Sequence, residues 1–210
     1  MATSNKLVLL DTNCLVRVYF SSLRPVLSRP ASGYEFKTLA GLAKELKNLA
    51  IRPDLAWLSD KVIQSEVDAA VVPLTRAQRQ AVEDDTPAIQ KHGNGELLKH
   101  CVATSRNHIR TLSRNDAKVL AASLELGAAM ATDEWPLRLV AGFYDYDDGK
   151  PVELFSSVEL IALLEREGLL TRDDRIRTYS GWLKSGENLL AESPEIYQDQ
   201  FGEKAPTAQD

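Results

Sequence analysis

Short apolar runs alternate with longer segments of helical periodicity, and this alternation limits the folds open to the chain. We predict strands at four runs, 6–10, 55–58, 128–131 and 152–155, each too short for a typical helix. Strands that alternate with helices favour a parallel sheet, because parallel neighbours need a long crossover connection. The sequence therefore predicts an α/β fold around a mainly parallel sheet of four or five strands.

The segments between these runs carry helix signals. Apolar side chains recur at helical spacing from Phe36 to Leu49, so 34–49 is predicted as one amphipathic helix. Ser113 and Asp116 resemble a capping box, and Gly127 is a plausible helix stop. Other helices are predicted at 15–21, from Ser59-Asp60 to about 71, from Thr75 to a fraying point at 85–87, and at 96–110, 117–126, 158–167 and 171–183.

Composition changes after Gly168. We therefore expect an α/β domain at 1–168 and a C-terminal extension at 169–210, which ends as a loosely attached tail with a short helix after Ser193-Pro194. The formal net charge of the chain is −5, and the stretch from Ser185 to Asp210 carries all of it. The body of the chain is therefore formally neutral.

One segment of this neutral body is basic. Residues 86–114 carry a formal charge of +4. Local positive charge attracts phosphate, although a solvated helix face would show the same pattern. The cations that we expect to contact a nucleic acid are Lys91, Lys99, Arg106, Arg110 and Arg114.

The sequence points away from membranes and from export. No run approaches the roughly 20 apolar residues of a membrane-spanning helix. The apolar start at 7–10 stops at Asp11, too soon for a signal-peptide core. Cys14 and Cys101 form no disulfide framework, so we expect free thiols and a cytoplasmic location.

Acidic residues stand where predicted strands end or where helices begin. Asp11 ends the first strand, Asp116 lies in the first turn of a helix, and Asp133 and Glu134 follow the strand 128–131. Glu66 lies one to two turns into the helix after the strand expected at 55–58. Functional groups gather at the carboxyl ends of strands in open α/β sheets, although each acid alone also fits a helix N-terminus or a turn.

Several carboxylates at one place repel each other unless a cation neutralises them. Mg²⁺ and Mn²⁺ prefer oxygen ligands, and Mg²⁺ often shares its shell with water and phosphate. The matching chemistry is phosphodiester hydrolysis, in which the metal activates water and polarises the phosphate.

Four segments in order resemble PIN-domain nucleases. Residues 7–13 resemble the opening strand with its Asp11-Thr12-Asn13 signature, and 62–67 resemble the helix that carries the second acid. Residues 115–122 are similar to the helix of the third acid, and 131–137 to the segment that ends the next strand. The resemblance spans roughly residues 7–168.

The resemblance implies a PIN-like three-layer sandwich and a metal-dependent endoribonuclease that cleaves single-stranded RNA. Asp11, Glu66 and Asp116 then correspond to metal-binding acids, with Thr12, Asn13 and Thr132 as supporting or phosphate-contacting groups. The fourth acid departs from the family pattern. Its usual position, two residues after the threonine, holds Glu134, while Asp133 stands between them, and we keep both as candidates. If the strand still alternates there, Asp133 points to the opposite side from Thr132 and Glu134.

Bacterial members of this family are often toxins that a small antitoxin protein neutralises, and family members often form homodimers. Both are expectations from the resemblance alone. The alternative from a different class is a catalytically inactive PIN-fold module that binds RNA or protein, in which the acidic tail competes for the basic segment or recruits a partner.

Overall fold

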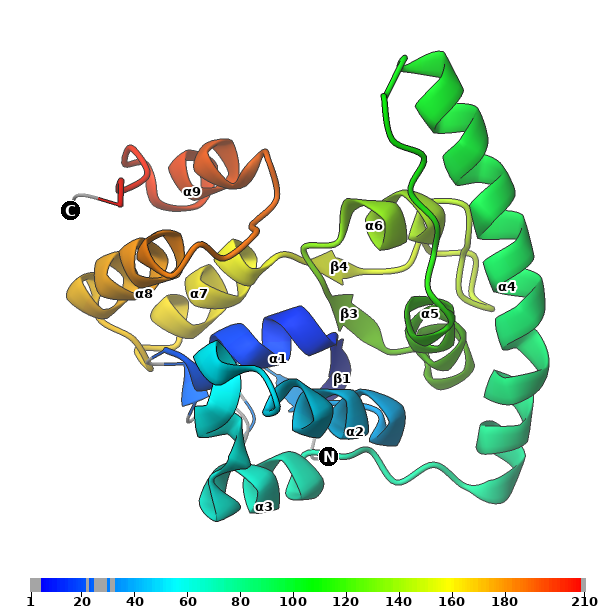
Figure 1. Cartoon of the computed structure of the whole chain (residues 1–210), viewed down its shortest axis with the longest axis horizontal. Coiled ribbons are helices and arrows are strands. Elements are labelled where there is room, and N and C mark those ends of the chain that lie inside the picture. The colour runs from blue at the N-terminus through cyan, green and yellow to red at the C-terminus, as the bar shows by residue number, and fades with distance from the viewer. Residues whose placement is uncertain (1–4, 22, 25–29, 31–32, 209–210) are drawn as a thin grey trace.

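The computed structural model describes residues 5–21, 23–24, 30 and 33–208 of the 210-residue chain. The strands in this part form one four-stranded sheet in the order β2-β1-β3-β4, and each neighbouring pair is parallel. Helices flank the sheet (Figure 1), so the predicted α/β class with a mainly parallel sheet is confirmed. The strands are β1 Lys6–Leu10, β2 Tyr34–Lys37, β3 Ala129–Ala131 and β4 Leu154–Phe155.

The two central strands send alternate side chains into two hydrophobic cores. In β1, Val8 and Leu10 pack in a first core, while Leu9 packs in a second. In β3, Ala129 and Ala131 belong to the first core and Met130 to the second. Successive side chains of a strand point to opposite faces, so the two cores lie on opposite faces of the sheet. The arrangement is compatible with a three-layer sandwich.

Nine α-helices lie in the described part of the chain. The first core takes side chains mainly from α1, α2, α3, α7 and α8, and the second mainly from α4, α5 and α6. Their bounds are α1 Thr12–Tyr19, α2 Ala40–Leu49, α3 Lys61–Ala69, α4 Arg76–Ala103, α5 Arg114–Leu126, α6 Trp135–Ala141, α7 Ser157–Arg166, α8 Arg172–Lys184 and α9 Ser193–Phe201.

The second strand lies elsewhere than the sequence predicts. Residues 34–37 pair with β1, so the helix expected at 34–49 begins only at Ala40. Residues 55–58, expected as a strand, lie within the 3-10 helix Pro53–Ser59. Aromatic and charged residues alternate from Tyr34 to Lys37, which is the period of a half-buried strand. The helical spacing of the apolar residues that follow masks this signal.

Helix α4 is continuous where a break is predicted. It runs for 28 residues through Pro87, so the fraying point at 85–87 and the separate helix at 96–110 are both wrong. Proline removes one internal hydrogen bond, but buried Val82 and Ile89 anchor the helix on both sides of it. A capping box formed by Thr75 and Gln78 fixes the N-terminal end. The C-terminal end of α4 extends beyond α6 (Figure 1).

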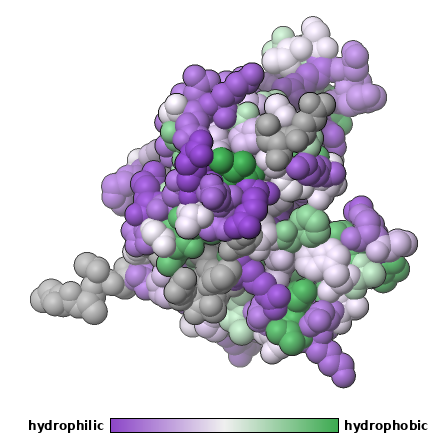
Figure 2. Space-filling view, turned by 90° about the vertical axis from the view of Figure 1, so that its left-hand side faces the viewer, coloured by the Kyte–Doolittle hydropathy of each residue, from purple (hydrophilic) through white to green (hydrophobic). Residues whose placement is uncertain are grey.

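The C-terminal extension is packed against the rest of the molecule. Trp182 of α8 is fully buried in the first core, and Tyr197 of α9 is fully buried 5.0 Å from the ring of Tyr179. Helix α9 confirms the short helix predicted after Ser193-Pro194, while the expectation of a loosely attached tail is wrong. Hydrophilic residues predominate on the face turned toward the viewer in Figure 2. Within the described residues, we find no helix long and apolar enough to cross a membrane.

Candidate functional site

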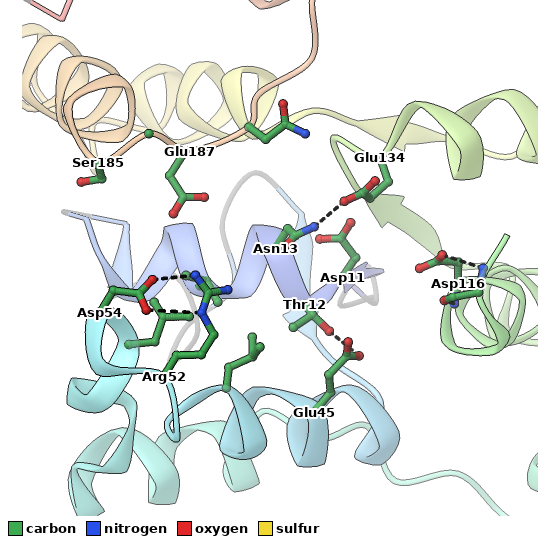
Figure 3. Close-up of a pocket in the computed structure, with 16 residues that line it drawn as sticks. Asp11, Thr12, Asn13, Glu45, Arg52, Asp54, Asp116, Glu134, Ser185 and Glu187 are labelled. Carbon is green, nitrogen blue, oxygen red and sulfur yellow. Dashed lines mark hydrogen bonds and ion pairs between the residues drawn. The ribbon is translucent and has the colours of Figure 1, made fainter. Parts of the chain in front are cut away.

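A pocket of about 460 Å³ opens beside the carboxyl ends of β1 and β3. The chain leaves β1 for β2 on one side and reaches β3 on the other, so the strand order reverses at this place. Open α/β sheets bind ligands at such a point, because the loops diverge there and leave a crevice. The pocket is lined by Asp11, Thr12, Asn13, Val16, Glu45, Leu49, Arg52, Asp54, Leu55, Ser113, Asp116, Glu134 and residues 185–188 (Figure 3).

Asp11 is a buried residue of the pocket lining. It is the N-cap residue of α1, and its side chain accepts a hydrogen bond from the backbone amide of Cys14 at 2.7 Å. The other carboxylate oxygen accepts a hydrogen bond from the Thr132 hydroxyl, which ties the ends of β1 and β3 together. Burial raises the pKa of Asp11 to about 6, against the lowering effect of these two donors.

Asp116 and Glu134 line the same pocket from α5 and from the turn before α6. Asp116 completes the predicted capping box with Ser113, and Glu134 accepts a hydrogen bond from the Asn13 amide at 2.5 Å. Burial raises the pKa of both groups, and neighbouring charge adds to the rise: Glu45 acts on Asp116, and Asp116 acts on Glu134. Negative charges in this pocket therefore raise the pKa values of neighbouring acids.

Glu45 is the acid that sequence reasoning missed. It lies on α2, which follows the true second strand, and it accepts hydrogen bonds from Thr12 at 3.0 Å and from Asn115 at 2.9 Å. Figure 3 shows its carboxylate directed toward the first turn of α1. Recognising the strand at 34–37 would have found it, since the next helix then presents an acid to the strand ends.

The structure does not bring Glu66 to this pocket. Glu66 lies on α3, and both of its carboxylate oxygens bind the Arg24 guanidinium at 2.9 Å. Its placement depended on a strand at 55–58, which is absent from the described residues. We therefore replace Glu66 by Glu45 in the candidate set of acids.

Asp133 points away from the pocket, as strand alternation predicts. Its carboxylate binds the Arg17 guanidinium at 2.5 Å and accepts hydrogen bonds from the amide and the hydroxyl of Ser157. The side chains of Asp133 and Arg17 are 1% and 2% exposed. This charge is neutralised by protein groups, so Asp133 is a structural residue rather than a free ligand.

Arg17 also binds the segment that closes the pocket on one side. Its Nη2 donates to the Asn188 carbonyl at 2.8 Å, and its Nε lies 3.2 Å from a carboxylate oxygen of Glu187. Glu187 and its neighbours in 185–188 line the pocket opposite α2 (Figure 3). The C-terminal extension is therefore part of the site.

The five predicted RNA-binding cations fall into two groups. Lys99 pairs with Glu96 at 2.7 Å and Arg114 with Glu83 at 3.4 Å. Within the described part of the chain, Lys91, Arg106 and Arg110 have no such ion pair, and all three side chains are exposed. Arg110 lies close enough to Glu134 to oppose the rise in its pKa.

The candidate donor set consists of oxygen atoms. In the part of the chain that the structure describes, no three acidic, histidine or cysteine side chains are gathered closely enough to hold a metal ion together. The acids share a pocket without forming a closed coordination sphere. Mg²⁺ tolerates such an arrangement, because it usually keeps several waters and takes one or two carboxylates.

Comparison with known proteins gives no further guidance. The chain has no significant match to a protein-family model, to a curated protein or to a solved structure. Only the pocket and its surroundings therefore bear on function.

Proposed function

We propose that the protein is a metal-dependent endoribonuclease that hydrolyses phosphodiester bonds of single-stranded RNA and has a PIN-like fold. One observation carries the proposal: Asp11, Glu45, Asp116 and Glu134 line one pocket at the strand ends. Among the described residues, none of the four forms an ion pair with a lysine or arginine. Carboxylates that lack a direct ion pair in a partly buried pocket are costly unless a cation offsets them.

The chemistry of this donor set fits Mg²⁺ or Mn²⁺. Asp11 and Asp116 would hold the ion, with Glu45 and Glu134 as further ligands or as acceptors for its waters. When bound, such an ion lowers the pKa of water and stabilises charge on a phosphate. Asp133 and Glu66 are not in this set, because arginine side chains already neutralise them.

The surrounding residues of the chain have supporting tasks. Thr132 and the Cys14 amide fix Asp11, while the Asn13 amide holds Glu134. Thr12 and Asn115 fix Glu45 in the same manner. These hydrogen bonds hold the carboxylates in defined orientations before a ligand arrives, which reduces the cost of ordering them later.

The direct test is cleavage of a labelled single-stranded RNA with Mn²⁺ and with EDTA. We expect cleavage that EDTA abolishes, and Asp11→Asn and Asp116→Asn should each lower the rate by about 100-fold or more. Lys150→Gln serves as a control on a distant loop, since its side chain pairs locally with Asp148. Cleavage that ignores EDTA, or that survives in both aspartate variants, refutes the proposal.

The biological setting is also a proposal. We propose a toxin neutralised by a small antitoxin protein, a homodimer and a cytoplasmic location; the first two rest on the PIN resemblance and the last on Cys14 and Cys101 as free thiols. Growth arrest on expression, relieved by a neighbouring small protein that co-purifies, supports the toxin role. Harmless expression of an enzyme active with Mn²⁺ contradicts it.

A second candidate function is a binding module that keeps the fold without catalysis. The specific observation in its favour is that no three candidate ligands among the described residues are already gathered. RNA binding with unchanged affinity in EDTA, without cleavage in Mn²⁺ or Mg²⁺, would favour this function.

A further inference from the structure

An aromatic residue directly follows a pocket-lining acid in the chain. Trp135 follows Glu134 and is the first residue of α6. The side chain is half-buried, and the ring of His100 from α4 lies 5.7 Å away. This contact brings the C-terminal part of α4 against the first residue of α6.

Arg106 lies over this indole. Its guanidinium carbon is 4.2 Å from the centre of the Trp135 ring, and its backbone amide donates to the Cys101 carbonyl at 3.0 Å. The backbone is therefore held while the exposed side chain has no carboxylate partner in the described part of the chain. Nucleic-acid bases stack both on indole rings and on guanidinium groups. A base can therefore replace the contact between Arg106 and Trp135.

Arg110 follows Arg106 by four residues on the same segment between α4 and α5. It is exposed, it forms no ion pair with the described residues, and its charge acts on Glu134. Lys99 and Arg114, by contrast, are bound to glutamates. Arg106 over the indole and Arg110 near Glu134 are therefore two cations that suit a phosphate chain bearing an unpaired base.

We infer that Trp135 and Arg106 form a stacking subsite for one unpaired base of an RNA strand, with Arg110 binding the phosphate that leads from this base into the acid pocket. The subsite rests on the proposed function, since it positions a strand for cleavage there. The base inserts between the indole and the guanidinium. A duplex would be excluded, because its bases are already stacked and paired.

The test uses the full chain carrying Asp11→Asn, in EDTA, so that binding is measured without cleavage. The probe is a short labelled single-stranded RNA, together with copies that lack one base at successive positions. We expect one position at which loss of the base weakens binding about tenfold, because one stacking contact is lost there. This series needs no change in the stacking residues, so misfolding cannot imitate the result.

Two substitutions then locate the subsite. Trp135→Leu keeps an apolar side chain at this place and should weaken binding of the intact strand about tenfold, with no further loss at the sensitive position. Arg106→Gln should weaken binding a few-fold, and Arg76→Gln, an equal charge change at the far end of α4, should leave it within twofold. Quenching of tryptophan fluorescence by RNA should vanish in Trp135→Leu. It should persist in Trp57→Leu, which changes a tryptophan of the 3-10 helix Pro53–Ser59.

The outcomes separate this inference from the proposed function. Unchanged binding in Trp135→Leu, with no position sensitive to base loss, overturns the subsite even if the unsubstituted chain cleaves RNA in Mn²⁺. Sensitivity to base loss at one position that disappears in Trp135→Leu supports the subsite even if no cleavage occurs. In that case only the proposed cleavage reaction is refuted.

Discussion

Arg17 and Asp133 form a fully buried ion pair across 116 residues of sequence, with Nη1 of one 2.5 Å from Oδ2 of the other. The pair joins the first helix to the segment after β3, and the same guanidinium holds the C-terminal segment at Asn188. One side chain thus connects α1, the segment after β3 and residues 187–188.

Asp133→Asn is expected to destabilise the fold, because it leaves the buried Arg17 charge with the partly exposed Glu187 as its one remaining ionic partner among the described residues. Breaking a buried pair typically costs about 3–5 kcal/mol. Asp68→Asn, which breaks the exposed pair with Lys47, should cost less than about 1 kcal/mol. Urea unfolding of both variants gives the comparison, and equal costs would mean that the buried pair has no special weight.

Matched substitutions of Glu45 and Glu66 test which of the two is the second acid of the site. Glu45→Gln should lower the rate of RNA cleavage by about 100-fold or more, because it removes a carboxylate from the pocket. Glu66→Gln should leave the rate within a few-fold, since its partner is Arg24. Initial rates in Mn²⁺ decide the matter, and the reverse order of effects would restore the prediction made from the sequence.

The raised pKa of Asp11 predicts a pH-dependent stability in EDTA. Between the ordinary value of 3.8 and about 6, the folded chain holds a proton that the unfolded chain releases, so stability falls as pH rises through this window. Asp11→Asn lacks this loss. Between pH 3.5 and 7, its free energy of unfolding should therefore rise by about 3 kcal/mol relative to that of the unsubstituted protein. Thermal or urea unfolding of both proteins at both pH values tests the sign of this change. A stability difference that is the same at both pH values would show that burial does not raise the pKa of Asp11.

Two glycines of α4 test how closely this helix approaches α6. A Cβ on Gly93 would lie 2.9 Å from Cγ1 of buried Val140, whereas a Cβ on Gly95 meets nothing within 4 Å. Gly95→Ala should stabilise the fold by up to about 1 kcal/mol through helix propensity. Gly93→Ala should be less stable than Gly95→Ala by at least about 1 kcal/mol, because Val140 must shift. Chemical denaturation of the two variants provides the measurement, and equal stabilities would contradict the close approach.

A chain that ends at Gly168 tests the predicted division into a domain and an extension. It lacks Trp182, which is buried in the first core, and loss of a large core side chain alone costs about 3–5 kcal/mol. We expect this shortened chain to lose cooperative unfolding. A chain that ends at Lys184 keeps Trp182 and should retain more of the native signal in near-ultraviolet circular dichroism. Cooperative unfolding of the shorter chain would support an independent domain at 1–168.

The ends of β1 and β3 were predictable because their signals are local. An apolar run that stops at an aspartate fixes β1 and Asp11, and a serine three residues before an aspartate fixes the start of α5. Alternation beyond β3 correctly separates Glu134 from Asp133. These features depend on neighbours in sequence, so one sequence is enough to recognise them.

The second strand and its acid depend on distant partners. The strand at 34–37 has only four residues, and its pairing with β1 gives it more support than its own propensity. Because the second strand was predicted at 55–58, the second acid was predicted on α3, as Glu66, and not on α2, as Glu45. Likewise, no local signal shows that Arg17 meets Asp133 or that Trp182 enters the first core, since both contacts join remote segments.

The contribution of residues 185–188 to the pocket has a consequence for the C-terminal extension. The Arg17 guanidinium binds Asp133, and it also binds Glu187 and the Asn188 carbonyl. A displacement of residues 185–188 would therefore open the pocket and remove two partners from a buried cation at once, so the shape of the pocket and the docking of the extension are energetically coupled.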